Sequence, residues 1–361
     1  MEKVKHIVGI GAGKGGVGKS TLALYLARAL QQRGKVVGLL DADVYGPSLQ
    51  IMCPCSKGPK REGDWLIPAT GSGLKLMSVA YFKRDVAIVR APIANETINQ
   101  FLKWTKWGEL DYLIVDFPPG TGDVQLTLLQ EAPFAGAVLV TTPQKVALAD
   151  VKKAHDCFKR MGVPTLGLVE NMSYFSAAGE RLFLLGEGGG ALLAKEVGCP
   201  LLGQIPMEPM IALGGDEGHT LFDGGDCPGK EAFIGVADRI DKFFDHHSGL
   251  QNVDLVFKQM SAAGTIEERL DGQGTAGIEK IFQIGPKDLV IEWTDGVLCR
   301  YDLEEVQRRC PCARCVEKPG GQGLAKRVRS VGRYGLKFEF TTGCSAGVFT
   351  FEALRAMKGI K

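Results

Sequence analysis

The stretch that decides the fold is "GKGGVGKST", which runs from Gly13 to Thr21. It follows the β-branched run "HIVGIG" and precedes a helical pattern over residues 19–33. It fits the phosphate-loop pattern G-x-x-x-x-G-K-[ST], in which glycines turn successive backbone N–H groups toward phosphates. The helix N-terminus adds partial positive charge. The sequence therefore predicts a nucleotide site formed by Gly13, Lys14, Gly15, Gly16, Val17, Gly18, Lys19, Ser20 and Thr21.

Two side chains of this loop have predicted roles. Lys19 is expected to neutralise the β- and γ-phosphates, and the Ser20 hydroxyl is expected to bind Mg²⁺. The predicted ligands are therefore ATP and Mg²⁺.

Short apolar runs alternate with helical patterns over residues 6–247, as in a mostly parallel α/β sheet flanked by helices. This predicts the P-loop NTPase fold class. The expected strands are 6–11, 36–40, 86–89, 112–116, 137–142, 165–170 and 201–205, and the clearest helices are 19–33, 93–105, 145–161 and 229–246.

The alternation of apolar runs and helical patterns ends after the last of these helices. Residues 248–275 are rich in Gly, Ser, Gln and Asp, which predicts a linker with one short helix around Leu255. Residues 276–361 then read as short strands with turns. We therefore expect an ATPase domain over 1–247, the linker, and a small β-rich metal-binding domain over 276–361.

Composition limits the partners. The 361 residues include 43 basic and 41 acidic ones, a balance that argues against binding nucleic acid or lipid through bulk charge. The N-terminal apolar run is too short for a secretory signal or a membrane span, so we expect a cytoplasmic protein with no membrane partner. Ten cysteines in such a chain indicate thiols, metal or clusters rather than disulfides.

Acidic residues follow two of the predicted strands. Asp41 and Asp43 end the second strand, and Asp116 ends "YLIVD". The carboxyl ends of strands are where α/β sheets place ligand groups. A single such residue is often only a helix cap, but three beside a phosphate loop favour a role at the nucleotide.

The second lysine of the loop introduces a resemblance. "KGGVGKS", with Lys14, resembles the deviant Walker A loop of the ATPase family that includes Par and Min positioning proteins, nitrogenase iron protein and Mrp-type iron–sulfur carriers. The resemblance implies that Lys14 reaches the partner's nucleotide in an ATP-bound homodimer. It also implies that Asp43 orients the attacking water, Asp41 helps to hold the Mg²⁺ shell, and Asp116 is the Walker B aspartate.

Longer stretches resemble the Mrp branch over residues 1 to 245. They are "LLDADVYGPS", "WGELDYLIVDFPPGTGD", "VENMSYF" and "GEGGG". This resemblance implies an ATP-hydrolysing iron–sulfur scaffold or carrier with apoprotein clients. It also implies that Asn171 hydrogen-bonds the adenine edge, whereas a plain turn residue is the alternative.

The chain departs from that branch at the cluster ligands. Mrp-type carriers hold a bridging [4Fe–4S] cluster with a C-x-x-C after "NMSYF", but no cysteine occurs here between Cys157 and Cys199. Without thiolates, ligation of a cluster at that position is chemically unavailable. Cys53 and Cys55 in "CPC" either supply two thiolates per subunit across a two-fold axis or belong to a plain surface loop.

The last quarter contains a second cysteine group. "IEWTDGVLCRYDLEEVQRRCPCARC" resembles the small domain after the ATPase in some plastid-type Mrp scaffolds, and the zinc-binding N-terminal domain of gamma-butyrobetaine hydroxylases. In those hydroxylases three cysteines and a later histidine bind zinc, and here Cys344 stands before the corresponding "GVF". Cys310, Cys312, Cys315 and Cys344 are therefore expected to form a four-sulfur site for Zn²⁺. Such a set also suits iron or an iron–sulfur cluster, and unliganded thiols remain the alternative.

Three functions stay open at this point. The first is an iron–sulfur carrier that uses non-standard cysteines. The second is a Par- or Min-like positioning ATPase. The third is an ATP-dependent dimer switch that recruits a protein client, with structural zinc and no cluster.

Overall fold

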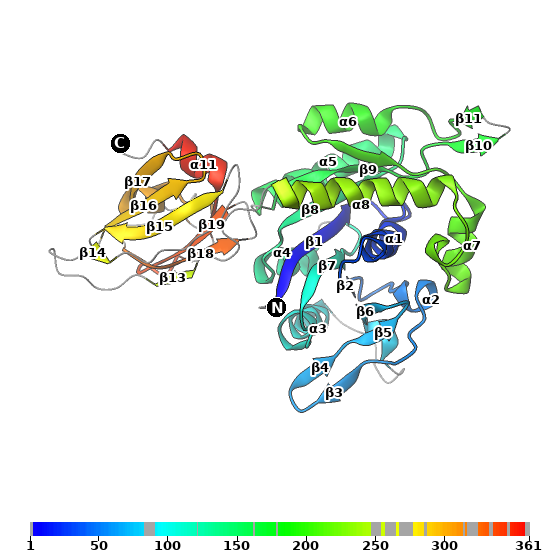
Figure 1. The fold of residues 1–361 in the computed structure, drawn as a ribbon, viewed down its shortest axis with the longest axis horizontal. Coiled ribbons are helices and arrows are strands. Elements are labelled where there is room, and N and C mark those ends of the chain that lie inside the picture. Colours follow the sequence, from blue (N-terminus) through cyan, green and yellow to red (C-terminus); the bar gives the residue numbers. More distant parts are fainter. Residues whose placement is uncertain are drawn as a thin grey trace. The chain divides into compact units, whose positions relative to one another are not determined.

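The chain divides into two compact units, Met1–Asp241 and Lys242–Lys361 (Figure 1). The structure is a computed structural model, and it describes residues 3–82, 91–120, 122–161, 163–177, 180–246, 254–256, 265–266, 277–284, 287–312, 315, 324–331, 335–344 and 347–357.

The first unit is organised around an eight-stranded sheet of order β12-β9-β8-β1-β7-β2-β6-β5. Its members are β1 (Val4–Ala12), β2 (Val37–Asp41), β5 (Ala69–Gly71), β6 (Leu74–Met77), β7 (Leu110–Asp116), β8 (Gly136–Thr141), β9 (Thr165–Glu170) and β12 (Leu201–Gln204). All neighbouring pairs are parallel except β5 with β6. The central strands are apolar almost without interruption because helices cover both of their faces.

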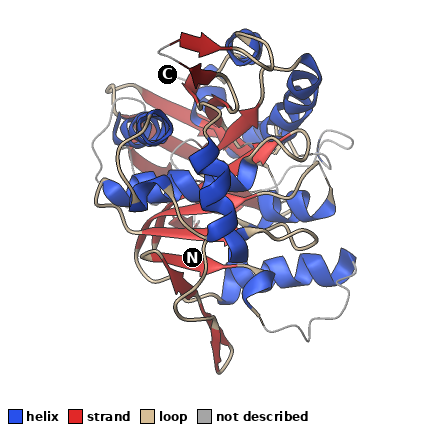
Figure 2. Cartoon of the chain, turned by 90° about the vertical axis from the view of Figure 1, so that its right-hand side faces the viewer, coloured by secondary structure: helices blue, strands red, loops and turns tan. Residues whose placement is uncertain are grey.

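The helices lie on both sides of these strands (Figure 2). They are α1 (Lys19–Gln32), α2 (Leu49–Met52), α3 (Ala91–Trp104), α4 (Asp123–Glu131), α5 (Lys145–Arg160), α6 (Gly189–Val197), α7 (Pro209–Glu217) and α8 (Pro228–His246), with the 3₁₀ turns η1 (Val79–Tyr81) and η2 (Leu221–Asp223). Side chains of α3 to α6 form one core with the sheet, for example Ile98, Leu128 and Phe158. On α8, Phe233 packs against Tyr25 of α1 with ring centroids 4.7 Å apart.

Two small hairpins extend from this unit. They are β3 (Lys60–Glu62) with β4 (Trp65–Ile67), and β10 (Phe175–Ala177) with β11 (Glu180–Leu182). The expected α/β fold class is confirmed, with strand ends within two residues of the prediction where both exist. The expected strand 86–89 lies outside the described residues.

The second unit consists of two four-stranded antiparallel sheets, β13-β18-β19-β20 and β14-β15-β16-β17. Its elements are β13 (Asp254–Val256), β14 (Thr265–Ile266), β15 (Ile278–Ile284), β16 (Asp288–Trp293), β17 (Leu298–Asp302), α9 (Leu303–Arg308), β18 (Ala325–Val331), β19 (Gly335–Phe340), β20 (Val348–Thr350) and α11 (Phe351–Ala356). Buried residues of both sheets, such as Ile291 and Phe338, form one core.

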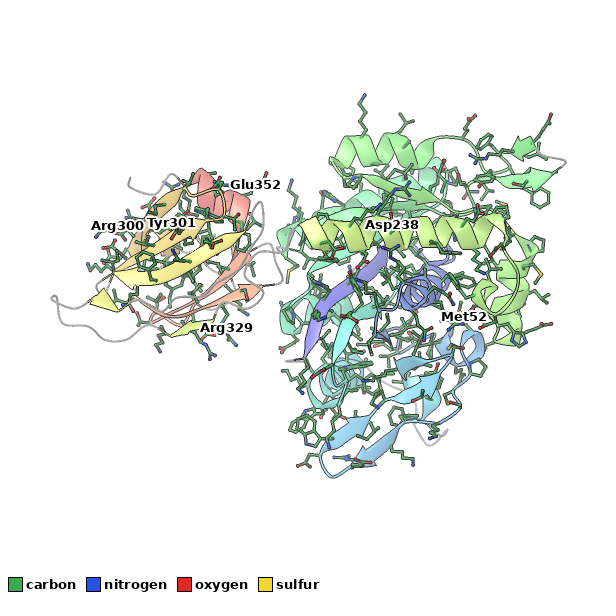
Figure 3. All side chains as sticks on the ribbon, viewed as in Figure 1. Met52, Asp238, Arg300, Tyr301, Arg329 and Glu352 are labelled. Atoms are coloured by element: carbon green, nitrogen blue, oxygen red, sulfur yellow. The ribbon has the colours of Figure 1, made fainter. Side chains whose placement is uncertain are left out.

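Successive side chains along a strand of this unit alternate between its two faces (Figure 3). Tyr301 of β17 is buried in the core, whereas its neighbour Arg300 pairs with Asp288 at 2.6 Å. The expected helix around Leu255 is wrong, because Leu255 belongs to β13 and pairs with Val328 of β18. Most of the expected linker lies outside the described residues. In the described part of the chain, no helix is long and apolar enough to cross a membrane.

Candidate nucleotide site and cysteine cluster

The phosphate loop lies between the end of β1 and the start of α1. Gly18 caps the helix in the left-handed region, with φ 87°, and Gly16 has φ 78°. L side chains rarely adopt this conformation, so both positions favour glycine. Helix α1 begins at Lys19, which is 8 % exposed, so the free N–H groups of the first helical turn lie beside a buried lysine side chain. This is an anion-binding geometry.

The predicted Mg²⁺ ligands meet at the ends of adjacent strands. Asp41 and Asp116 are paired in register on β2 and β7. The Ser20 hydroxyl donates to Oδ2 of Asp116 at 2.5 Å, while the buried Oδ1 of Asp116 has no hydrogen-bond partner among the described residues. A hydroxyl and a carboxylate that has one buried oxygen without a partner suit a hard cation such as Mg²⁺.

Burial acts on both carboxylates of this pair. It raises the pKa of Asp116 to about 6, although Lys19 and Ser20 oppose the increase. Burial and then the Asp116 charge raise the pKa of Asp41 to about 7. Because both shifts disfavour the charged forms, a cation at this edge would relieve an unfavourable arrangement.

The side chain of Asp41 is already engaged by the protein. Its oxygens accept hydrogen bonds from the Ser78 hydroxyl at 3.1 Å and from the Asp43 backbone N–H at 3.0 Å. Asp43 in turn accepts from the N–H groups of Tyr45 and Gly46, at 3.3 and 3.0 Å. These bonds fix the direction of the Asp43 carboxylate.

Asn171 lies against the phosphate loop. Its Nδ2 donates to the carbonyl oxygen of Val17 at 2.9 Å, and the side chain is 8 % exposed. The amide is thus used within the protein, and its expected contact with adenine stays a prediction. Lys14 is half-buried on the same loop.

Two residues of this region escaped the sequence reasoning, Ser78 and Glu170. Ser78 comes directly after β6, and this position at a strand end is the sequence feature that could have identified it. Glu170 was visible in "VENM" but was not singled out, and it is fully buried at the end of β9.

The "CPC" segment is buried at its first cysteine, whereas Pro54 is exposed. Cys53 is 1 % exposed, and the Tyr81 hydroxyl donates to its carbonyl oxygen at 2.6 Å. Burial raises the pKa of the Cys53 thiol. Cys55 is half-buried. A cluster bridging two subunits through this segment would require Cys53 to leave its packed position.

The C-terminal cysteines come together as expected. The Sγ atoms of Cys310, Cys312, Cys315 and Cys344 all lie within 4.8 Å of one another. Cys344 Sγ is 3.6 Å from Cys310 Sγ, 3.6 Å from Cys312 Sγ and 3.3 Å from Cys315 Sγ. Four sulfurs around one tetrahedral ion with bonds of about 2.3 Å stand about 3.8 Å apart, so this set fits a single ion after a small expansion.

Local structure explains this convergence. Asp302 caps α9 by accepting from the N–H groups of Glu304 and Glu305, and the chain leaves that helix into the first three cysteines. Cys344 comes from a turn after β19, in which Gly343 has φ 84°. The cluster thus joins segments that follow strands of different sheets.

The thiols differ in acidity. Burial raises the pKa of Cys310 and raises the pKa of Cys315 to about 11. For Cys312 burial also acts upward, but the Cys315 N–H and the neighbouring thiols lower its pKa overall. Cys312 is half-buried, whereas the other three cysteines are buried.

Fold and nucleotide site together define a nucleotide-binding P-loop NTPase. Comparison with solved structures agrees with this class. A nucleotide-binding protein from Archaeoglobus fulgidus, solved with ADP, is 35 % identical with a TM-score of 0.56, over 64 % of this chain and 93 % of that one. The cell division ATPase MinD from Pyrococcus furiosus shares the fold, at 22 % identity and a TM-score of 0.51, over 66 % of this chain and 99 % of that one.

The chain belongs to the ParA family described as NUBPL iron-transfer P-loop NTPase, which matches residues 3–241. Residues 282–355 match the family of gamma-butyrobetaine hydroxylase-like N-terminal domains. Both expected resemblances are thereby confirmed, and nucleotide hydrolysis is the general activity of this NTPase class.

Curated relatives carry iron–sulfur names. An iron–sulfur cluster carrier protein from Aquifex aeolicus is 45 % identical over 65 % of this chain and 66 % of its own length. The chloroplastic Fe–S cluster assembly factor HCF101 from Arabidopsis thaliana is 45 % identical over 60 % of this chain and 42 % of its own length. The chain therefore spans about two thirds of the bacterial relative and less than half of the chloroplast one.

Proposed function

We propose that this chain is an ATP-hydrolysing iron–sulfur cluster carrier of the Mrp type, which works as a homodimer and delivers clusters to apoproteins. The observation that carries the proposal is the Ser20–Asp116 pair beside Lys19 and Asp43, inside the region that matches the iron-transfer family. The names of the relatives from Aquifex and Arabidopsis support an iron–sulfur cluster as the cargo.

Each residue of the nucleotide site has a proposed part in hydrolysis. Lys19 and the N–H groups of the loop bind the β- and γ-phosphates. Ser20 and Asp116 would hold Mg²⁺, which would neutralise charge on the phosphates, and Asp41 would border this shell. Asp43 orients the attacking water. The water oxygen bonds to the γ-phosphorus while the bond between that phosphorus and the β-phosphate oxygen breaks, which leaves ADP and inorganic phosphate; one water proton stays on the phosphate and the other passes to solvent. Lys14 reaches the partner subunit's nucleotide, and Asn171 contacts the adenine.

The cysteine cluster is proposed as a site for one metal ion, Zn²⁺ or iron. A [4Fe–4S] cube places four iron atoms between its thiolates, so it needs wider spacing than one ion does. The four sulfurs, all within 4.8 Å, favour the single ion. A transferable cluster would then need other ligands, such as Cys53 and Cys55 from two subunits.

The close spacing of the four sulfurs also favours a second candidate function. This is an ATP-dependent dimer switch that recruits a protein client through a zinc-stabilised C-terminal unit and carries no cluster. The switch needs no cluster ligands between Cys157 and Cys199, and the chain has no cysteine there.

Anaerobic reconstitution with iron and sulfide distinguishes these functions. The carrier should gain a broad visible absorption band and about four irons per dimer, and a Cys344→Ser variant should keep that band. The loaded protein should then pass its cluster to an apo-ferredoxin, faster with ATP. A full chain that takes up zinc but never iron with sulfide would exclude the carrier and leave the switch.

A further inference from the structure

A buried carboxylate lies next to the nucleotide site without belonging to it. Glu170 ends β9 and is 0 % exposed. Its oxygens accept hydrogen bonds from the Ser173 hydroxyl at 2.6 Å, from Gln204 Nε2 at 2.9 Å, and from the Gly190 backbone N–H. A buried carboxyl group is costly unless it is hydrogen-bonded, and here three donors bond to it.

The three donors come from separate segments. Ser173 precedes the chain that forms the β10–β11 hairpin, and Gly190 lies where that chain returns as α6. Gln204 ends the neighbouring strand β12. The carboxylate therefore ties together the departure and the return of the hairpin segment and the edge of the sheet.

The turn that Glu170 closes contains strain. Met172 has φ 53°, and among the described residues only Ser72 is another non-glycine with positive φ. A side chain in this region costs energy and persists only where surrounding contacts enforce it. The bond from Ser173 to Glu170 spans Met172, and the Ser173 N–H donates to the carbonyl oxygen of Ile205 at 2.9 Å.

This turn determines the position of the Asn171 side chain. Its backbone N–H donates to the Thr141 carbonyl at 2.8 Å, and its side chain donates to the Val17 carbonyl at 2.9 Å. A Cβ built on Gly18 would collide with the Asn171 amide, so the two segments are in close contact. Fixing the turn thus fixes an amide directly on the phosphate loop.

We infer that Glu170 is a positioning residue that holds the strained turn of residues 171–173, so that the Asn171 amide stays on the phosphate loop at Val17. This inference rests on the proposed function in one respect, that the loop binds nucleotide. Glu170 itself touches no reacting atom.

Calorimetric titration of the full chain with Mg²⁺·ATP tests the coupling. Glu170→Gln replaces one acceptor oxygen by an NH₂ group that faces N–H and O–H donors, so the turn should loosen and the Kd should rise about tenfold. Asn171→Ala should weaken binding similarly. If Glu170 acts through Asn171, the double variant should bind no more weakly than Asn171→Ala alone.

A matched control separates positioning from general stability. Asp241 is also a buried carboxylate, bonded to Tyr112 at 2.7 Å near the start of β7, whereas the nucleotide site lies at the end of that strand. Asp241→Asn should lower Tm as Glu170→Gln does and leave the Kd unchanged. Additive losses in the double variant, or an unchanged Kd in Glu170→Gln, would overturn the inference.

Ser173 offers a second test of the same contact, because its hydroxyl donates to Glu170. If Glu170→Gln does not fold, Ser173→Ala removes one donor to the same carboxylate, and it should raise the Kd in the wild-type background but not in Asn171→Ala. Equal effects in both backgrounds would count against the inference. A wild-type chain that binds no ATP would instead refute the proposed function.

Discussion

The Ser20 hydroxyl and the Asp116 carboxylate, 96 positions apart in the sequence, share a hydrogen bond of 2.5 Å. Ser20 stands in the first turn of α1 and Asp116 at the end of β7, so the bond links the phosphate loop to the neighbouring strand. The other Asp116 oxygen is buried and without a hydrogen-bond partner in the described part of the chain. A cation bound here would therefore satisfy an oxygen that the protein itself leaves unsatisfied.

The two lysines of the loop should behave differently. Lys19→Ala should abolish hydrolysis, with at least a hundredfold loss of kcat, because the phosphates lose their buried counter-charge. Lys14→Ala should keep ATP affinity within about threefold and lower the turnover that depends on protein concentration. Steady-state ATPase assays over a concentration series, with calorimetric Kd values, check both. Equal loss of ATP binding in the two variants would contradict the role of Lys14 across the dimer.

The nucleotide-free protein should be less stable at neutral than at acidic pH because of Asp41. Its pKa of about 7 exceeds the ordinary 3.8, so the folded state keeps a proton that the unfolded state has lost. The free energy of unfolding therefore falls as pH rises from about 4 to about 7. Asp41→Asn removes this group, so the free energy of unfolding of the variant, relative to wild type, should increase by about 3 kcal/mol as pH rises from about 5 to about 8. Chemical denaturation without Mg²⁺ measures this, and a difference that does not change with pH would refute it.

The cysteine cluster should bind about one metal ion per chain, and it should depend on Cys344. Cys344→Ser removes the sulfur that lies within 3.6 Å of the other three, so bound metal and thermal stability of the second unit should both fall. Cys299→Ser is the matched control, since Cys299 packs on the same core but lies outside the cluster. Metal analysis and calorimetry distinguish the variants, and equal metal content in both would exclude this ligand set.

Gly347 should matter for the same site although it supplies no ligand. A Cβ at this position would collide with Cys310 Sγ. Gly347→Ala should therefore weaken metal binding by about tenfold to a hundredfold, as loss of a supporting contact typically does. Competition with a chromophoric chelator measures the affinity. An unchanged affinity would mean that Cys310 is not a ligand in the bound state.

Sequence could predict the phosphate loop and the acidic edge because both follow from short-range rules. A loop motif fixes Gly13 to Thr21 locally, and parallel strands bring Asp41 and Asp116 to one edge wherever they end. The four cysteines were predictable for a different reason, since their spacing resembles a known domain and thiol ligands tolerate few other arrangements.

The remaining features depend on contacts that no local pattern records. A short helix was expected around Leu255 within the linker, but the pairing of Leu255 with Val328 makes this segment a strand. The hydrogen bonds of Glu170 depend on where α6 and β12 return, which the motif "VENM" does not state. The burial of Cys53, whose carbonyl oxygen accepts from the Tyr81 hydroxyl, likewise cannot be read from "CPC".

The cysteine cluster has one further consequence. Four thiols whose sulfurs lie within 4.8 Å need only a short approach to reach the bond length of a disulfide. An ion that occupies them would also protect them, because a thiolate bound to metal is not free to attack another sulfur. Supply of metal and exposure to oxidants would thus compete for the same four atoms, so the folding of the second unit would report the redox state of its surroundings.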